Sequence, residues 1–127
     1  MQRNLSGGGL ELLGYSLGRA GALDQGPVPL APGETAELVL FWRPLTGALE
    51  TEIPVSITVQ EGEGHTVLAL TRAPVNGRYA MRDWQASEIV RDVLRLSLPG
   101  SLAPGLYRLT IAWPGLAATD LTDMRVQ

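Results

Sequence analysis

The side chains best suited to ligand chemistry lie in residues 73–88, where aromatic, charged and amide groups occur close together. They are Arg78, Tyr79, Arg82, Asp83, Trp84, Gln85 and Glu88. An exposed aromatic ring can stack on a sugar face while neighbouring guanidinium, carboxylate and amide groups bond to its hydroxyls. The segment therefore predicts a glycan-binding patch, formed by Tyr79, Arg82, Asp83, Trp84 and Gln85. In the competing interpretation, Trp84 is buried and closes one end of the fold.

The sequence gives little support for catalytic, metal-binding or phosphate-binding chemistry. The absence of cysteine excludes disulfides and thiolate metal sites, and a single histidine, His65, disfavours a catalytic triad or a histidine metal centre. Carboxylates are paired at residues 61 and 63 and at 120 and 123, without the density of a calcium loop or a reason to assign glycosidase chemistry. The triple glycine at residues 7–9 precedes a strand pattern, not a helix, so it is no phosphate cradle. We predict no catalytic residue, no metal and no cofactor.

Length and composition indicate one folded domain. The chain has 127 residues, of which 45% are hydrophobic and 18% charged, and its formal net charge is -3. That charge argues against a nucleic-acid partner. No apolar run approaches the roughly 18 residues of a membrane-spanning helix, so we predict no membrane insertion. The start lacks a signal-peptide pattern, which indicates either a cytoplasmic protein or a module from a longer chain.

The Ser-Gly-Gly-Gly run at residues 6–9 has the composition of a linker. We therefore predict a linker or disordered N-terminus over residues 1–9 and a single β-sandwich domain over residues 10–127.

The strongest structural pattern covers residues 102–113. Pro104 and Gly105 predict a turn, after which the large residues Tyr107, Leu109, Ile111 and Trp113 alternate with smaller or polar ones. Such a face needs a second sheet to cover it, so this segment is expected to be a central strand. A tyrosine soon after a turn also matches a tyrosine corner, in which the hydroxyl bonds back to the preceding backbone. An ordinary core tyrosine is the alternative.

Six further segments show strand patterns separated by Gly, Pro and other turn residues. They are residues 10–17 with a bulge near Gly14, 35–43, 52–60, 65–72, 89–98 and 120–126. Pro54 in the third of these suggests an edge position or a bulge. About seven or eight short strands without a convincing helix predict an all-β, two-sheet antiparallel sandwich of immunoglobulin or fibronectin type III character. An eight-stranded jelly roll is the second choice.

Two features break the expected polar-outside pattern. In residues 35–43, Ala36, Leu38, Leu40 and Trp42 form the core face, yet Val39 and Phe41 occupy the opposite face. Either a loop covers those two side chains or they contact another domain. Asp92 lies in phase with core leucines; if it is buried it needs donors, such as Trp84 Nε1 or a backbone N–H.

Several segments together resemble a known kind of module. They are residues 12–15 (Leu-Leu-Gly-Tyr), 30–35 (Leu-Ala-Pro-Gly-Glu-Thr), 40–43 (Leu-Phe-Trp-Arg), Trp84 with 88–92 (Glu-Ile-Val-Arg-Asp), 98–99 (Leu-Pro) and 104–109 (Pro-Gly-Leu-Tyr-Arg-Leu). Their order and spacing resemble the β-sandwich modules that follow the membrane part of some bacterial dolichyl-phosphate-mannose-type glycosyltransferases. The resemblance covers about residues 10–113. It implies an accessory, non-catalytic domain in the extracytoplasmic cell envelope.

Three hypotheses follow. The first is a non-catalytic interaction module of a larger bacterial envelope protein, whose partners are other domains of the same chain, other proteins or glycans. The second is a stand-alone carbohydrate-binding domain that uses the residues around Trp84. The third is an enzyme whose site the sequence does not reveal.

Overall fold

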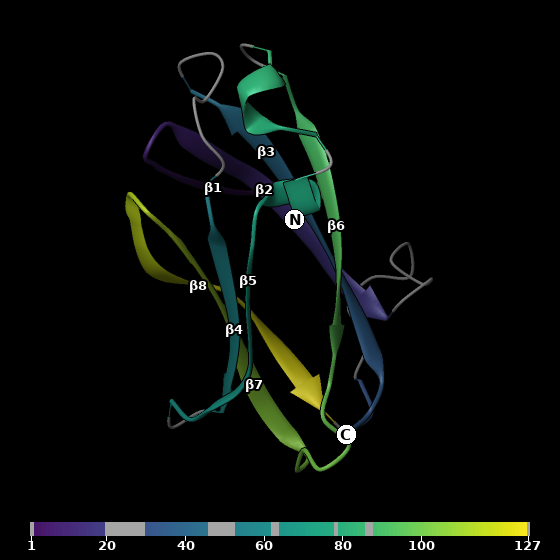
Figure 1. Ribbon diagram of the computed structural model, residues 1–127. Helices are drawn as coiled ribbons and strands as arrows, with labels where there is room; N and C mark the ends of the chain where they lie inside the picture. Colours follow the sequence, from purple (N-terminus) through teal and green to yellow (C-terminus); the bar gives the residue numbers. More distant parts are fainter. Residues whose placement is uncertain are drawn as a thin grey trace.

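The computed structural model describes residues 2–19, 30–45, 53–61, 64–77, 79–85 and 88–126. Within these residues it forms eight strands in two four-stranded antiparallel sheets, which face each other as a sandwich (Figure 1). The strands are β1 Gln2–Gly7, β2 Leu10–Arg19, β3 Thr35–Pro44, β4 Val55–Glu61, β5 Thr66–Arg72, β6 Val90–Ser97, β7 Gly105–Trp113 and β8 Leu116–Val126. Two short 3-10 helices, η2 Pro74–Gly77 and η3 Met81–Asp83, lie between β5 and β6.

The strand order confirms the predicted immunoglobulin-like or fibronectin type III-like sandwich. One sheet has the order β1-β2-β3-β6 and the other the order β5-β4-β7-β8. The chain crosses between the sheets after β3, β5 and β6, so β2, β3 and β6 match the A, B and E strands of an immunoglobulin domain, and β4, β7 and β8 match C, F and G. We call these two layers the first and the second sheet.

Alternation with a period of two determines the core, as predicted. The core faces of β3, β6 and β7 are buried at every second residue, and β7 lies centrally between β4 and β8. The bulge expected near Gly14 is present as a register shift between Leu12 and Gly14. It lets Leu12 and Tyr15 both face the core, although their spacing is odd.

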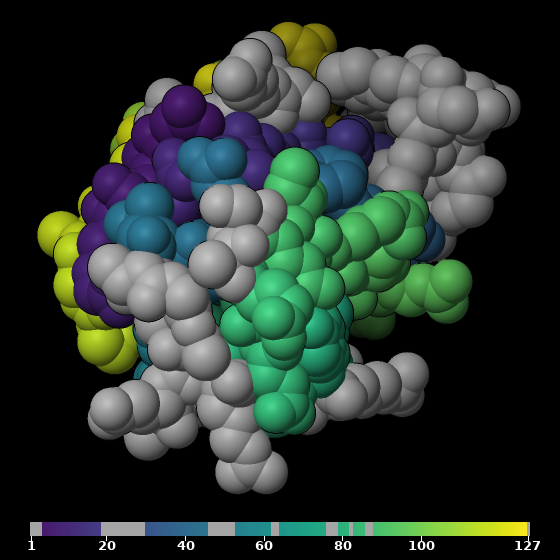
Figure 2. All heavy atoms as spheres, turned by 90° about the horizontal axis from the view of Figure 1, so that it is seen from above, coloured from purple at the N-terminus to yellow at the C-terminus, as the bar shows by residue number. Residues whose placement is uncertain are grey.

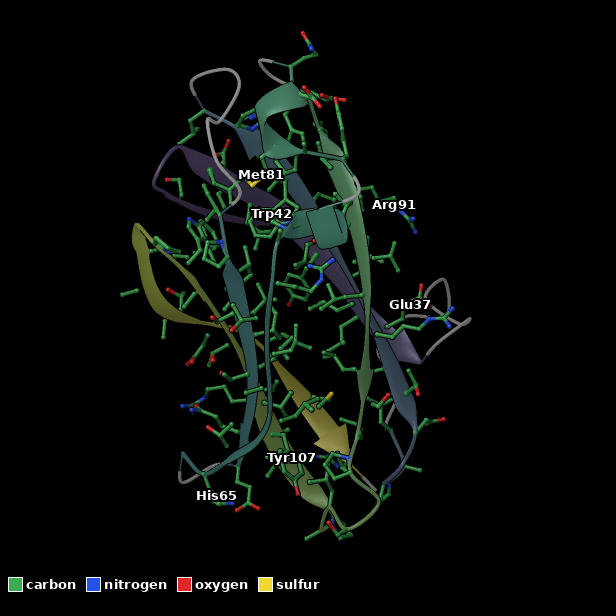
Figure 3. All side chains as sticks on the ribbon, in the orientation of Figure 1. Glu37, Trp42, His65, Met81, Arg91 and Tyr107 are labelled. Atoms are coloured by element: carbon green, nitrogen blue, oxygen red, sulfur yellow. The ribbon has the colours of Figure 1, made fainter. Side chains whose placement is uncertain are left out.

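The predicted tyrosine corner is confirmed. Tyr107 stands near the start of β7 with its ring buried, and its hydroxyl donates a hydrogen bond of 2.7 Å to the carbonyl oxygen of Ala103. The bond ties the connection between the sheets to the strand that follows it. Figure 3 shows Tyr107 at the lower end of the sandwich, opposite the end that holds Met81.

Replacing Tyr107 with phenylalanine should destabilise the fold by about 1 kcal/mol or more, because the buried Tyr107 loses its hydrogen bond to the Ala103 carbonyl. Urea unfolding of both proteins measures the difference. An unchanged free energy of unfolding would show that the corner bond contributes nothing.

The predicted N-terminal linker is wrong for the described residues. Residues 2–7 form β1, which pairs with β2, and Gly8 and Gly9 make the turn between the two strands. The glycines serve a close backbone contact: a Cβ on Gly7 would lie 2.1 Å from the carbonyl oxygen of Gly115. Trp113 Nε1 donates to the Gly7 carbonyl at 2.9 Å. A glycine run that looks like a linker is therefore a packed hairpin against the β7–β8 turn.

The edge position suggested by Pro54 is also wrong. Pro54 is exposed and precedes β4, which starts at Val55 and lies between β5 and β7. Because the proline stands outside the hydrogen-bonded ladder, it does not prevent β4 from being a central strand.

Asp92 is fully buried, and its donors come from places that the sequence did not indicate. Trp42 Nε1 donates to Asp92 Oδ2 at 3.1 Å, and the guanidinium of Arg72 binds both carboxylate oxygens. Trp84, the donor suggested from the sequence, bonds elsewhere. Arg72 ends β5 in the second sheet, whereas Trp42 and Asp92 belong to β3 and β6 of the first sheet. The ion pair therefore joins the two sheets.

Replacing Asp92 with asparagine should destabilise the fold by about 3 kcal/mol, because the largely buried Arg72 loses its counter-charge. Urea unfolding measures the loss. The control is Glu37→Gln, which breaks an ion pair whose arginine is largely exposed and should cost less than about 1 kcal/mol. Equal effects of the two substitutions would contradict the role assigned to Asp92.

Candidate functional site

The predicted glycan patch does not present Trp84 to a ligand. The Trp84 side chain is 1% exposed, and its Nε1 donates to the Tyr79 carbonyl at 3.0 Å. Its ring lies against the ring of Tyr79, with the two centroids 6.2 Å apart. A buried indole has no free face for a sugar, so stacking on Trp84 is excluded and the competing interpretation of a buried plug is correct.

The neighbouring polar groups bond mainly to one another. The Tyr79 hydroxyl lies 2.7 Å from Glu88 Oε1 and 3.2 Å from the Asp83 carbonyl, and the Gln85 backbone N–H donates to Glu88 Oε1 at 2.9 Å. The hydrogen bond to the carboxylate raises the pKa of Tyr79. The Gln85 N–H and then the Tyr79 hydroxyl lower the pKa of Glu88. Together these hydrogen bonds tie Tyr79, Asp83, Gln85 and Glu88 to one another.

The exposed side chains of Asp83 and Gln85 flank this closed segment, while the side chain of Arg82 and the whole of Arg78 lie outside the described residues. Figure 2 looks onto this end of the molecule, where η2 contacts β6. The glycan-binding role of Tyr79, Asp83 and Gln85 stays a prediction. It lacks the exposed aromatic ring that was expected to stack on the sugar, because Trp84 is buried.

Tyr79→Phe should move the pKa of Glu88 upward toward its ordinary value, because one of its two donors is lost. A carbon-13 NMR titration of the Glu88 carboxyl group measures this. In the unaltered protein the lowered pKa means that Glu88 contributes stability above the pKa of the unfolded state, and that this contribution disappears as the pH falls through the folded pKa. A Glu88 pKa at or above the ordinary glutamate value would contradict the arrangement.

A better candidate site is the outer face of the first sheet, on the side away from the core. Val39 is only 1% exposed although it points outward, in register between Ser16 on β2 and Val93 on β6. Next to it, Phe41 is half-buried and in register with Gly14. Apolar residues on the solvent side of a sheet depart from the usual alternation.

A shallow hollow lies beside Phe41 on this face. It measures about 350 Å³ and is lined by Leu13, Gly14, Phe41 and Ile89. Gly14 contributes no side chain, which leaves room beside the Phe41 ring. Ile89 is 60% exposed, and Val93 lies exposed further along β6. We call Leu13, Val39, Phe41, Ile89 and Val93 the outer apolar face.

Charged residues border the outer apolar face. Glu11 pairs with Arg43, whose Nε lies 3.0 Å from Glu11 Oε1, and Glu37 pairs with Arg95 at 3.7 Å. In both pairs the glutamate is 13% exposed and the arginine is more exposed. The border therefore presents guanidinium groups more than carboxylates.

Arg91 is the third arginine of this face and is in register with Phe41. Figure 3 shows it pointing away from the sandwich, whereas Trp42 points between the sheets. Within the described part of the chain, Arg91 forms no ion pair.

The sequence indicated only part of this site. Val39 and Phe41 stood out as apolar residues on an outer face, but Leu13, Ile89 and Val93 did not. The missing signal was the register of β2, β3 and β6, which places residues far apart in the sequence on one surface.

The other candidates give no site within the described residues. His65 is exposed next to the β4–β5 turn, and Figure 3 shows it at one end of the molecule. Over the ranges described, histidine, aspartate and glutamate form no group of three that could hold a metal ion. Nor does a helix in those ranges have the length and apolarity needed to span a membrane.

Comparisons with known proteins identify the fold of the chain but do not assign the chain to a family. No family model and no curated protein matches the chain. Among solved structures, the C-terminal domain of wzt matches with a TM-score of 0.66 and 15% identity over 99% of this chain and 78% of that one. The Pseudomonas fluorescens alkylpurine DNA glycosylase AlkC, bound to DNA containing an abasic site analog, matches with a TM-score of 0.54 and 10% identity. The latter match covers 94% of this chain and 30% of AlkC. At these identities the matches show a shared β-sandwich fold.

Proposed function

We propose that this chain is a non-catalytic interaction module of a larger bacterial envelope protein, and that it binds another protein surface through the outer apolar face. The observation that carries the proposal is a contiguous apolar surface on the solvent side of a sheet. Phe41 is half-buried at its centre, and Ile89 and Val93 are exposed on β6 or just before it, while Val39 itself is buried. Surfaces of this kind often mark interaction sites.

The solved structures support an accessory role. The wzt structure is named as a C-terminal domain, and the match in AlkC covers 30% of a longer chain. In both cases the sandwich is one part of a larger protein. The association with glycosyltransferases and the location in the envelope rest on the sequence resemblance alone, and the comparisons add no support for the glycosyltransferase link.

The carbohydrate-binding alternative is weaker than the protein-contact proposal. It needed the ring of Trp84, which is buried, and the hydroxyl of Tyr79, which bonds to Glu88. The exposed Asp83 and Gln85 could still bond to sugar hydroxyls, but no exposed aromatic face accompanies them among the described residues of this segment. A glycan-array signal lost in Gln85→Ala would restore this alternative.

Hydroxyl-radical labelling followed by mass spectrometry tests the protein-contact proposal. The chain is labelled after purification alone and again in the complex isolated from its native source. Labelling of Leu13, Phe41 and Ile89 should fall several-fold in the complex, because a partner covers them. Leu106, which is 56% exposed at the Tyr107 end, is the internal control and should not change. Equal labelling of the outer apolar face in both samples would overturn the proposal, and turnover in a hydrolase screen would overturn its non-catalytic part.

A further inference from the structure

We infer that the partner of the outer apolar face is a polypeptide segment that carries a carboxylate beside apolar side chains, and that Arg91 binds this carboxylate. The inference rests on the proposed function and specifies the chemistry of the partner. It combines three observations: the apolar hollow, the excess of arginine around it and the position of Arg91.

The hollow determines the apolar half of the partner. Leu13, Phe41 and Ile89 surround a space that Gly14 leaves open, so an aliphatic side chain can enter beside the Phe41 ring. Burying one such side chain favours association, and part of that gain offsets the entropy lost on binding. The hollow is shallow, so this contact cannot select a partner by shape alone.

The charge of this face determines which charged group the partner carries. Among the side chains that the structure describes, the strands of this face present Arg43, Arg91 and Arg95 outward against Glu11 and Glu37. This leaves an excess of positive charge on a chain whose formal net charge is -3. Arg43 and Arg95 already have carboxylate partners from this chain. Arg91 is exposed, and it remains for a carboxylate of another molecule.

The register of β3 and β6 places the apolar contact and the charged contact side by side. Arg91 is in register with Phe41, and it lies on β6 between Ile89 and Val93 in the sequence. A carboxylate bound to Arg91 therefore has apolar surface on either side. Guanidinium groups favour planar, bidentate carboxylate pairing, which gives the contact specificity as well as energy. A second copy of the chain fits less well, because its own outer apolar face carries the same positive excess.

Defined peptides test the inference with the isotope-labelled 127-residue chain. Three peptides of about ten residues are compared: leucine alternating with aspartate, leucine alternating with lysine, and serine alternating with aspartate. Chemical-shift changes locate the contact, and titration gives the affinity. The leucine–aspartate peptide should bind best and shift the amides of Leu13, Phe41 and Val93, and its binding should weaken as salt is raised.

Charge reversal provides the decisive comparison. Arg91→Glu should weaken binding of the leucine–aspartate peptide by about tenfold and favour the leucine–lysine peptide instead. Arg108→Glu reverses an exposed arginine on the second sheet, which pairs with Asp120, and should leave binding unchanged. The amide spectra of both variants show whether the fold is intact.

Each contrary outcome overturns the inference. These outcomes are equal binding of the leucine–aspartate and leucine–lysine peptides, an unchanged affinity in Arg91→Glu, chemical-shift changes outside the outer apolar face, or no binding of any peptide.

Tight binding to anionic phosphatidylglycerol vesicles instead of peptides would assign a membrane surface to this face. Self-association in sedimentation that Ile89→Glu abolishes would assign a second copy. If labelling shows protection of the outer apolar face but the peptides show no charge preference, the proposed function stands and only this inference fails.

Discussion

The rest of the structure depends on a buried carboxylate. Asp92 has no contact with solvent, so its charge must be satisfied by protein groups, and it takes them from both sheets. The contacts continue beyond it, because the ring of Trp42 meets that of Trp113 edge-on at 5.2 Å, and Trp113 bonds to the Gly7 carbonyl. A single series of contacts, Arg72–Asp92–Trp42–Trp113–Gly7, thus runs through the sandwich and links five strands. It fixes how the two sheets face each other.

The same contacts explain why the candidate binding surface lies where it does. With Trp42 and Asp92 held inside, their neighbours Phe41 and Arg91 must point outward. A shift of β3 by one residue would place Phe41 inside, but it would also turn Trp42 outward and remove its hydrogen bond to Asp92. The apolar outer face is therefore a consequence of the buried network, and the surface combines an aromatic ring with a cation because the two strands are aligned by that network.

The segment between β5 and β6 shows how residue types alone mislead. Tyr79, Trp84 and Glu88 are residues that bind sugars in many proteins, but here their polar atoms bond to one another and to the local backbone. Trp84 fills the end of the core, where the burial of its apolar ring stabilises the fold. Meanwhile the apolar residues of the outer face carry no recognisable motif, and only their arrangement in space makes them a candidate.

The sequence by itself determined the class of fold, most strands, the core faces of β3, β6 and β7, the bulge near Gly14 and the corner formed by Tyr107. These features depend on alternation along one strand or on a turn of a few residues, so local order is enough to reveal them. The tertiary structure alone decided that the first residues form a strand, that Asp92 bonds to Trp42 and Arg72, that Trp84 is buried, and that Leu13 and Ile89 border one hollow. Each of these depends on which strands lie side by side and in which register, and that is settled by packing between residues far apart in the chain.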